Sequence, residues 1–114
     1  MFGFGSGNLV KHIYEITKTF LDMEGYGLVS QIRRSAISIP SNIPEGCGRR
    51  SYKDSIKFYS IARGSLFELE TQIYISKDLE FLNASKADEI LEYDKKLQED
   101  IKWFYNYHNS LIES

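Results

Sequence analysis

The side chains most capable of covalent or metal chemistry are one cysteine and two histidines. Cys47 lies between two glycines and close to Arg49 and Arg50, whose charges favour the reactive thiolate. Its spacing assigns no general base to it, so we expect a packed or merely accessible thiol. His12 and His108 lie on different predicted helices and show no HxxxH spacing, whereas zinc needs a compact ligand set. We therefore predict no catalytic residue, no cofactor and no metal site, and a protein that is not an enzyme.

A polar set falls on the second and third predicted helices. If these helices face each other, Glu45 and Arg63 could meet in a hydrogen-bonded ion pair. Such a pair is costly to desolvate, and a fully satisfied one often sets the register of two helices. The alternative is an acid–base or ligand pocket. The polar set consists of Gln31, Asn42, Glu45, Arg63 and Glu68.

A basic set in the same region is the main candidate for binding. Phosphate recognition needs repeated cations, and arginine offers phosphate two parallel hydrogen bonds. No RRM, KH or zinc-finger pattern accompanies these cations. The alternative is a solvated helix surface neutralised by the acidic fourth helix. The basic set consists of Arg33, Arg34, Arg49, Arg50, Lys53 and Lys57.

The charges are separated along the chain. Residues 31–63 carry seven Arg and Lys against two acidic residues, whereas residues 64–114 carry five Lys against eleven acidic residues. The net charge of −2 thus hides a dipolar particle. Pairing within or between subunits explains this separation as readily as a polyanionic ligand does.

The length of 114 residues predicts one domain over residues 1–114, with residues 1–7 as a flexible, glycine-rich lead-in. No apolar run reaches the roughly 18 residues that a bilayer span needs. A single cysteine excludes an internal disulfide and fits a reducing cytoplasm, where we expect this protein.

Apolar residues at helical spacing predict four helices joined by short turns, as in an all-α, antiparallel up-down-up-down bundle. The first stripe follows Asn8 as N-cap and ends before a turn at Gly25, and the second ends at Gly46. We expect Pro40 to kink the second helix, and Ser41 and Asn42 to offer side-chain hydrogen bonds to the backbone groups that Pro40 frees. Ser51 and Ser85 are the expected N-caps of the third and fourth helices. The first stripe runs through Leu9, Ile13, Ile16, Phe20 and Met23, and the second through Leu28, Ile32, Ser35 or Ala36, Ile39 and Ile43. The third runs through Phe58, Ala62, Ser65 or Leu66, Leu69, Ile73 and Ser76, and the fourth through Ile90, Asp94, Leu97, Ile101, Phe104, His108 and Leu111.

Aromatic residues off these stripes exceed what four short helices can easily bury. Exposed aromatic seams on the third and fourth helices would be covered in a homo-oligomer. The alternative is that the tyrosines lie on the surface with their hydroxyls in water. The candidate oligomer interface consists of Tyr59, Phe67, Tyr74, Tyr93, Trp103 and Tyr107.

Two motifs carry a family resemblance. The stretches "YGLVSQIRRSAISIPSNIPEGCGR" and "KFYSIARGSLFELETQIYISKDL" resemble the four-helix-bundle proteins encoded in intervening sequences of bacterial 23S ribosomal RNA genes. The likeness runs from about Ile13 to Leu82. A related group is the accessory protein of diversity-generating retroelements, a basic pentamer thought to engage nucleic acid and reverse transcriptase.

The resemblance implies a four-helix bundle assembled as a homopentamer. Family members usually carry alanine where Pro44 stands here, and the overall acidity departs from the basic relatives. The predicted function is a non-enzymatic, homo-oligomeric interaction module that engages RNA or a ribonucleoprotein through the basic set. The alternative is a protein-binding adaptor or scaffold whose partner packs on the aromatic seams.

Overall fold

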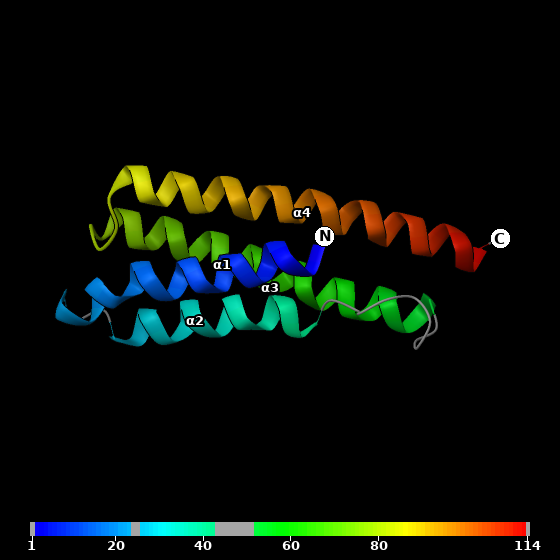
Figure 1. Cartoon of the computed structure of the whole chain (residues 1–114), viewed down its shortest axis with the longest axis horizontal. Helices are drawn as coiled ribbons and strands as arrows, with labels where there is room; N and C mark the ends of the chain where they lie inside the picture. The colour runs from blue at the N-terminus through cyan, green and yellow to red at the C-terminus, as the bar shows by residue number, and fades with distance from the viewer. Residues whose placement is uncertain (1, 24–25, 43–51, 114) are drawn as a thin grey trace.

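A computed structural model of the chain describes residues 2–23, 26–42 and 52–113 and is helical throughout its regular elements (Figure 1). No strand occurs among these residues, which confirms the all-α prediction. The elements are α1 (Phe2–Thr17), the 3₁₀ helix η1 (Lys18–Met23), α2 (Tyr26–Ser41), α3 (Tyr52–Asp78) and α4 (Ala84–Glu113).

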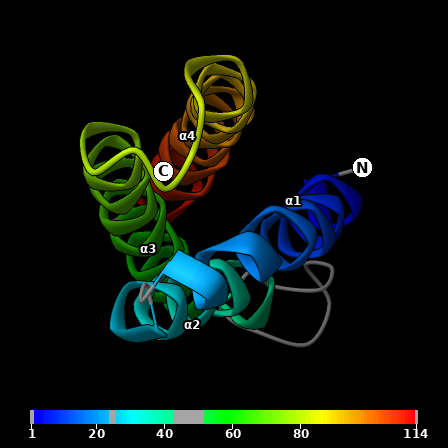
Figure 2. The same ribbon diagram turned by 90° about the vertical axis from the view of Figure 1, so that its left-hand side faces the viewer.

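The helices run alternately up and down and form the predicted antiparallel bundle. Each helix packs against two neighbours, so that α2 and α4 lie diagonally opposite each other (Figure 2). The helices α3 and α4 contain 27 and 30 residues, whereas α1 and α2 contain 16 each. As a result α3 and α4 extend beyond α1 and α2 at one end of a particle 52 Å long and 20 Å wide (Figure 1).

The predicted apolar stripes meet in one buried core. Leu9, Ile32, Leu69 and Ile101 contribute from α1 to α4, respectively, and none of these side chains has exposed surface. Burying one such side chain stabilises the fold by about 1.5–3 kcal/mol. The hydrophobic effect therefore fixes the facing sides of the four helices, because the same residues that repeat every three or four positions are the ones removed from water.

The first helix differs from the prediction at both ends. It begins at Phe2, so residues 2–7 are helical rather than a flexible lead-in, and Asn8 lies inside the helix instead of at its N-cap. Adding a residue to an existing helix gains one hydrogen bond, which allows glycines to continue it at a cost of roughly 1 kcal/mol each. The α-helix stops at Thr17 and continues as η1 to Met23. The expected turn residue Gly25 lies outside the described residues.

The second helix ends at Ser41, earlier than the expected end at Gly46. Pro40 lies in its last turn, where the missing N–H removes a helical hydrogen bond. Ser41 and Asn42 make side-chain hydrogen bonds, but not to the Ala36 carbonyl that Pro40 leaves without its usual donor: Ser41 Oγ donates to the Ile37 carbonyl at 2.8 Å, and Asn42 Nδ2 donates to the Ser38 carbonyl at 2.7 Å. These bonds satisfy carbonyls of the last turn and close the helix. Pro44, Gly46 and the expected cap Ser51 lie outside the described residues.

The connection between α3 and α4 is a tight turn. Glu80 has a φ of 62°, and the Glu80 and Phe81 amides donate to the carbonyls of Lys77 and Ser76 at 3.1 and 2.9 Å. This is a Schellman cap, with glutamate where glycine is usual. The N-cap of α4 is Asn83 rather than Ser85, because Asn83 Oδ1 accepts a 2.9 Å bond from the Lys86 amide.

Candidate nucleic-acid interface

Arg33 is held in the seam between α1 and α2. Its guanidinium lies 4.4 Å from the centre of the Tyr14 ring, Nε donates to Thr17 Oγ1 at 3.0 Å, and Nη2 donates to the Tyr14 carbonyl at 3.4 Å. Thr17 Oγ1 in turn donates to the Ile13 carbonyl at 2.7 Å. The half-buried Arg33 side chain is therefore fixed by contacts from α1 and still carries its charge to the surface.

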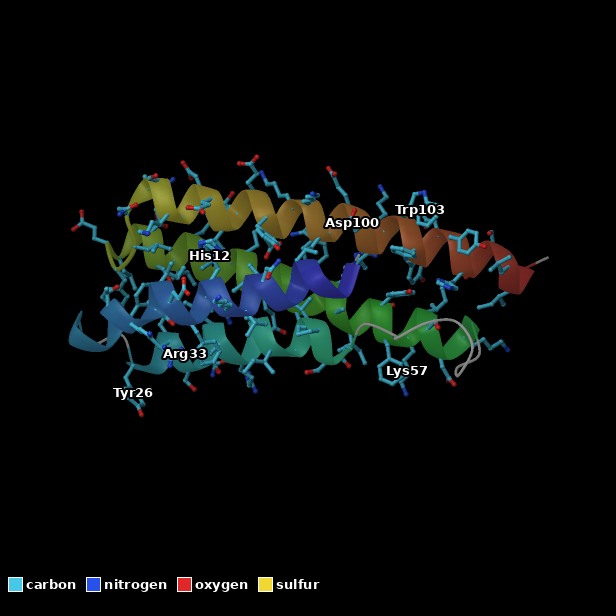
Figure 3. All side chains as sticks on the ribbon, viewed as in Figure 1. His12, Tyr26, Arg33, Lys57, Asp100 and Trp103 are labelled. Atoms are coloured by element: carbon cyan, nitrogen blue, oxygen red, sulfur yellow. The ribbon has the colours of Figure 1, made fainter. Side chains whose placement is uncertain are left out.

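The other described cations of the basic set are exposed. Arg34 donates to Gln31 Oε1 at 2.9 Å, and Lys53 and Lys57 lie on the first turns of α3. Figure 3 shows Arg33 and Lys57 well apart along the length of the molecule. The structure thus separates the arginine pair of α2 from the lysine pair of α3. Arg49 and Arg50 lie outside the described residues.

Two acidic residues of α4, Asp88 and Glu89, pair with residues outside the basic set. Among the described residues, Asp88 forms an ion pair with Lys77 at 3.5 Å, and Glu89 lies 3.4 Å from His12 Nε2. No described member of the basic set is in an ion pair within the described part of the chain. Because α2 and α4 lie on opposite corners of the bundle, the acidic helix does not cover the arginines of α2.

The polar set is dispersed in the part of the chain that the structure describes. Arg63 is exposed, with its guanidinium 5.5 Å from the centre of the Phe67 ring, and Glu45 lies outside the described residues. Glu68 accepts a 3.3 Å hydrogen bond from Ser35, whereas Gln31 binds Arg34. The proposed pair of Glu45 with Arg63 therefore stays a prediction.

Serine hydroxyls make the polar contacts between α2 and α3. Ser65 Oγ donates to Ser38 Oγ at 2.7 Å, and Asn42 Nδ2 is 3.2 Å from the same Ser38 oxygen. Together with the bond from Ser35 to Glu68, these contacts set the relative positions of the two helices. The apolar periodicity placed Ser35 and Ser65 as alternative positions of the second and third stripes, but it did not predict that their hydroxyls would join the two helices.

Asp94 is a polar residue in the middle of the core. It has no exposed surface and accepts a 2.5 Å hydrogen bond at Oδ1 from Gln98 Nε2, which also lies 3.2 Å from Glu70 Oε2. Its Oδ2 has no hydrogen-bond partner among the described residues. Burial, and to a smaller extent the charge of Glu70, raise the pKa of Asp94 from 3.8 to about 7 against the opposing effect of the Gln98 hydrogen bond. The sequence feature that indicates this buried carboxyl is the position of Asp94 in the apolar stripe, between Ile90 and Leu97.

The aromatic residues of the candidate oligomer interface divide into two groups. Tyr59 is buried against His108, with ring centres 5.4 Å apart, and Tyr93 is half-buried against the core. Phe67, Tyr74, Trp103 and Tyr107 are exposed. Trp103 is 61% exposed and stacks on Tyr107 with ring centres 5.5 Å apart. Figure 3 shows Trp103 on the outer side of α4, near the end where α3 and α4 extend beyond the other helices.

No group of three or more potential metal-ligating side chains occurs among the described residues. In the same residues, no helix is long and apolar enough to cross a membrane. The geometry defines a small antiparallel helical bundle with an arginine-bearing seam, a buried carboxyl and an exposed aromatic pair.

Comparison with known proteins identifies the family. The family model of the 23S rRNA-intervening sequence protein matches residues 5–102, so the chain belongs to this family, as the two sequence motifs indicated. A similar solved structure is that of a protein of unknown function from the S23 ribosomal protein family of Bacteroides thetaiotaomicron. It has a TM-score of 0.85 and 20% identity over 92% of this chain and 98% of the other, which supports the shared fold. No curated protein matches this chain.

Proposed function

We propose that this protein is a non-enzymatic, self-associating module of the cytoplasm that binds RNA through the basic set on α2 and α3. The observation that carries the proposal is the pairing of α4: two of its acidic residues, Asp88 and Glu89, contact Lys77 and His12, and neither pairs with a described cation of the basic set. The described cations of the basic set therefore keep their positive charge available at the surface of a chain whose net charge is −2. The family's name, which refers to an insertion in ribosomal RNA, points to RNA as the polyanion.

Self-association would compensate for the small number of cations in one chain. Ile61, Phe67 and Tyr74 are exposed apolar side chains on α3, and Trp103 with Tyr107 adds an exposed aromatic pair on α4. Exposed aromatic side chains such as these are enriched at protein contacts. In the homopentamer that the family resemblance implies, five copies of the basic set would act together and strengthen a weak contact. Light scattering at micromolar concentration tests this, and the mass of a single 13.2 kDa chain would refute self-association.

Salt-dependent binding tests the RNA proposal. Fluorescence anisotropy with a labelled single-stranded RNA should show an affinity that falls steeply between about 50 and 200 mM salt, because phosphate contacts release counterions. Replacing Lys53 and Lys57 by alanine should weaken binding and reduce the slope of log affinity against log salt by about 0.7 per lost contact. The matched control replaces Lys86 and Lys95, two exposed lysines of α4. Absence of binding at about 50 mM salt would refute the proposal.

The stacked pair of Trp103 and Tyr107 favours a second candidate function, a protein-binding adaptor. Exposed tryptophan and tyrosine are enriched at the centres of protein interfaces. In that case, replacing both by serine should abolish co-purification of a specific partner and leave RNA affinity unchanged. The exposed residue Ile112 supplies a control substitution on the same helix.

A further inference from the structure

The seam between α1 and α2 contains a surface pocket of about 490 Å³. Its walls combine two cations, Arg33 and Arg34, with the rings of Tyr14 and Tyr26 and the apolar side chain of Ile37. No carboxylate is among the described residues that line it. Figure 3 shows Arg33 between the ribbons of α1 and α2, and Tyr26 near the end of α2. The volume lies in the range typical of small-molecule sites, roughly 300–1,000 Å³.

We propose that this pocket binds one nucleotide of a single-stranded RNA, with the phosphate on Arg33 and Arg34 and the base against Tyr26. The inference rests on the proposed function and deepens it, because it names a defined subsite at the α1–α2 seam within a broader cationic surface. A free nucleotide has the same chemistry, and the experiment below separates the two sources.

The phosphate end of the pocket is preorganised. Arg33 is fixed by the Tyr14 ring, Thr17 Oγ1 and the Tyr14 carbonyl, so little side-chain freedom is left to lose on binding. Its Nη1 makes no hydrogen bond to any described residue, which leaves a donor for an incoming oxygen. Arg34 is exposed and reaches the same pocket from the next position of α2. Two guanidinium groups that line one pocket can together bind a phosphate, which has several acceptor oxygens.

The other wall suits a flat aromatic ring. Tyr26 is 74% exposed even though it lines the pocket, and an uncovered ring beside cations is the arrangement on which bases stack in single-strand-binding proteins. One face of the Tyr14 ring is covered by Arg33, so Tyr26 offers the more accessible aromatic surface. The phosphate of a phosphorylated peptide would bind the arginines, but phosphoserine has no flat ring to stack on this exposed tyrosine. We therefore favour a nucleotide.

The direct test is an amide chemical-shift titration of the full-length protein with AMP. AMP should shift the amide signals of Tyr26, Arg33 and Arg34 more strongly than adenosine or inorganic phosphate does at equal concentration. A phosphoserine peptide and a single-stranded decanucleotide form two further arms. The decanucleotide should bind more tightly than AMP, because neighbouring phosphates reach further cations; equal affinity would make the free nucleotide the source and overturn the assignment to RNA.

Variants locate the contribution of each wall. Tyr26→Ala should weaken decanucleotide binding by about five-fold or more, the effect of losing one stacked base, whereas Tyr26→Phe should retain it. Arg34→Ala should weaken binding of AMP and of the decanucleotide to a similar degree, whereas the charge-matched control Lys95→Ala should leave both unchanged. Because Arg33 also joins two helices, Arg33→Lys is used there in place of alanine, and circular dichroism verifies that each variant folds.

The outcomes separate the pocket from the proposed function. If RNA binds with steep salt dependence but Tyr26→Ala and Arg34→Ala bind as tightly as wild type, the pocket assignment is wrong and the proposed function stands. If no RNA binds but AMP still shifts the three amide signals, the proposed function is wrong, and the pocket is a site for a free nucleotide. A phosphoserine peptide that binds as tightly as AMP, without loss in Tyr26→Ala, would overturn the nucleotide assignment.

Discussion

The buried carboxyl of Asp94 should make the stability of this protein fall as pH rises from 4 to 7. In the unfolded chain Asp94 ionises near its ordinary pKa of 3.8, whereas burial raises the folded-state pKa to about 7. Between these values the folded state binds the additional proton, so increasing pH favours unfolding. A shift of about 3 units at 1.36 kcal/mol each sets a ceiling of about 4 kcal/mol on the loss, complete above pH 7.

The variant Asp94→Asn isolates this effect. Asparagine has nearly the same shape and can still accept the hydrogen bond from Gln98 at Oδ1, but it cannot ionise. The difference in unfolding free energy between the variant and wild type should therefore grow with pH by up to about 1.4 kcal/mol per unit, and stay constant above pH 7. At pH 8 we expect the variant to be the more stable protein.

Urea unfolding followed by far-ultraviolet circular dichroism at fixed protein concentration, from pH 4.5 to 8.5, measures this difference. A constant protein concentration is needed because self-association would itself shift the apparent stability. Glu70→Gln serves as the second variant: it removes a neighbouring charge and should lower the pKa of Asp94 without abolishing the pH dependence. A stability difference independent of pH, or an Asp94 carboxyl that titrates near 4 by NMR, would refute the reasoning.

Five further substitutions test the caps and the core. Glu80→Gly should stabilise the protein by about 0.5–1 kcal/mol, because glycine adopts a positive φ without the usual steric penalty. A lower free energy of unfolding of this variant in urea would contradict the Schellman assignment. Asn83→Ala should cost about 1 kcal/mol in the same measurement and Ser85→Ala should cost almost nothing, whereas the reverse order would restore Ser85 as the cap. Tyr59→Ala should lower the free energy of unfolding by about 3–5 kcal/mol, whereas Tyr107→Ala should lower that of the monomer by less than about 0.5 kcal/mol. Equal melting temperatures of the two variants would refute the division into buried and exposed aromatics.

The helical bundle could be predicted because its cause is a local, repeating property of the sequence. Residues such as Leu9, Ile32, Leu69 and Ile101 recur at helical spacing, and a helix with one apolar face must bury that face. The two motifs then identified the family, which the match over residues 5–102 confirms. Helix ends were predicted less well. Ser85 and Asn83 are both good caps by residue type, and only the backbone path after the turn at Glu80 selects Asn83.

The candidate site depended on distances that periodicity does not specify. The sequence grouped six cations because they are close along the chain, yet the structure separates Arg33 from Lys57 along the bundle and joins Arg33 to Tyr14 and Thr17 of another helix. Cross-helix contacts follow from the rotation and axial offset of two packed helices, and neither quantity can be derived from a single stripe.

The sequence by itself determined the four helices, their buried faces and the family, since apolar periodicity acts residue by residue. The tertiary structure decided which polar groups lie close together: the pocket with Arg33 and Arg34 at the seam of α1 and α2, the serine contacts between α2 and α3, and the contact of Gln98 of α4 with Glu70 of α3. The physical reason is that apolar burial has no preferred direction, whereas hydrogen bonds and charge pairs require particular atoms within about 3–4 Å.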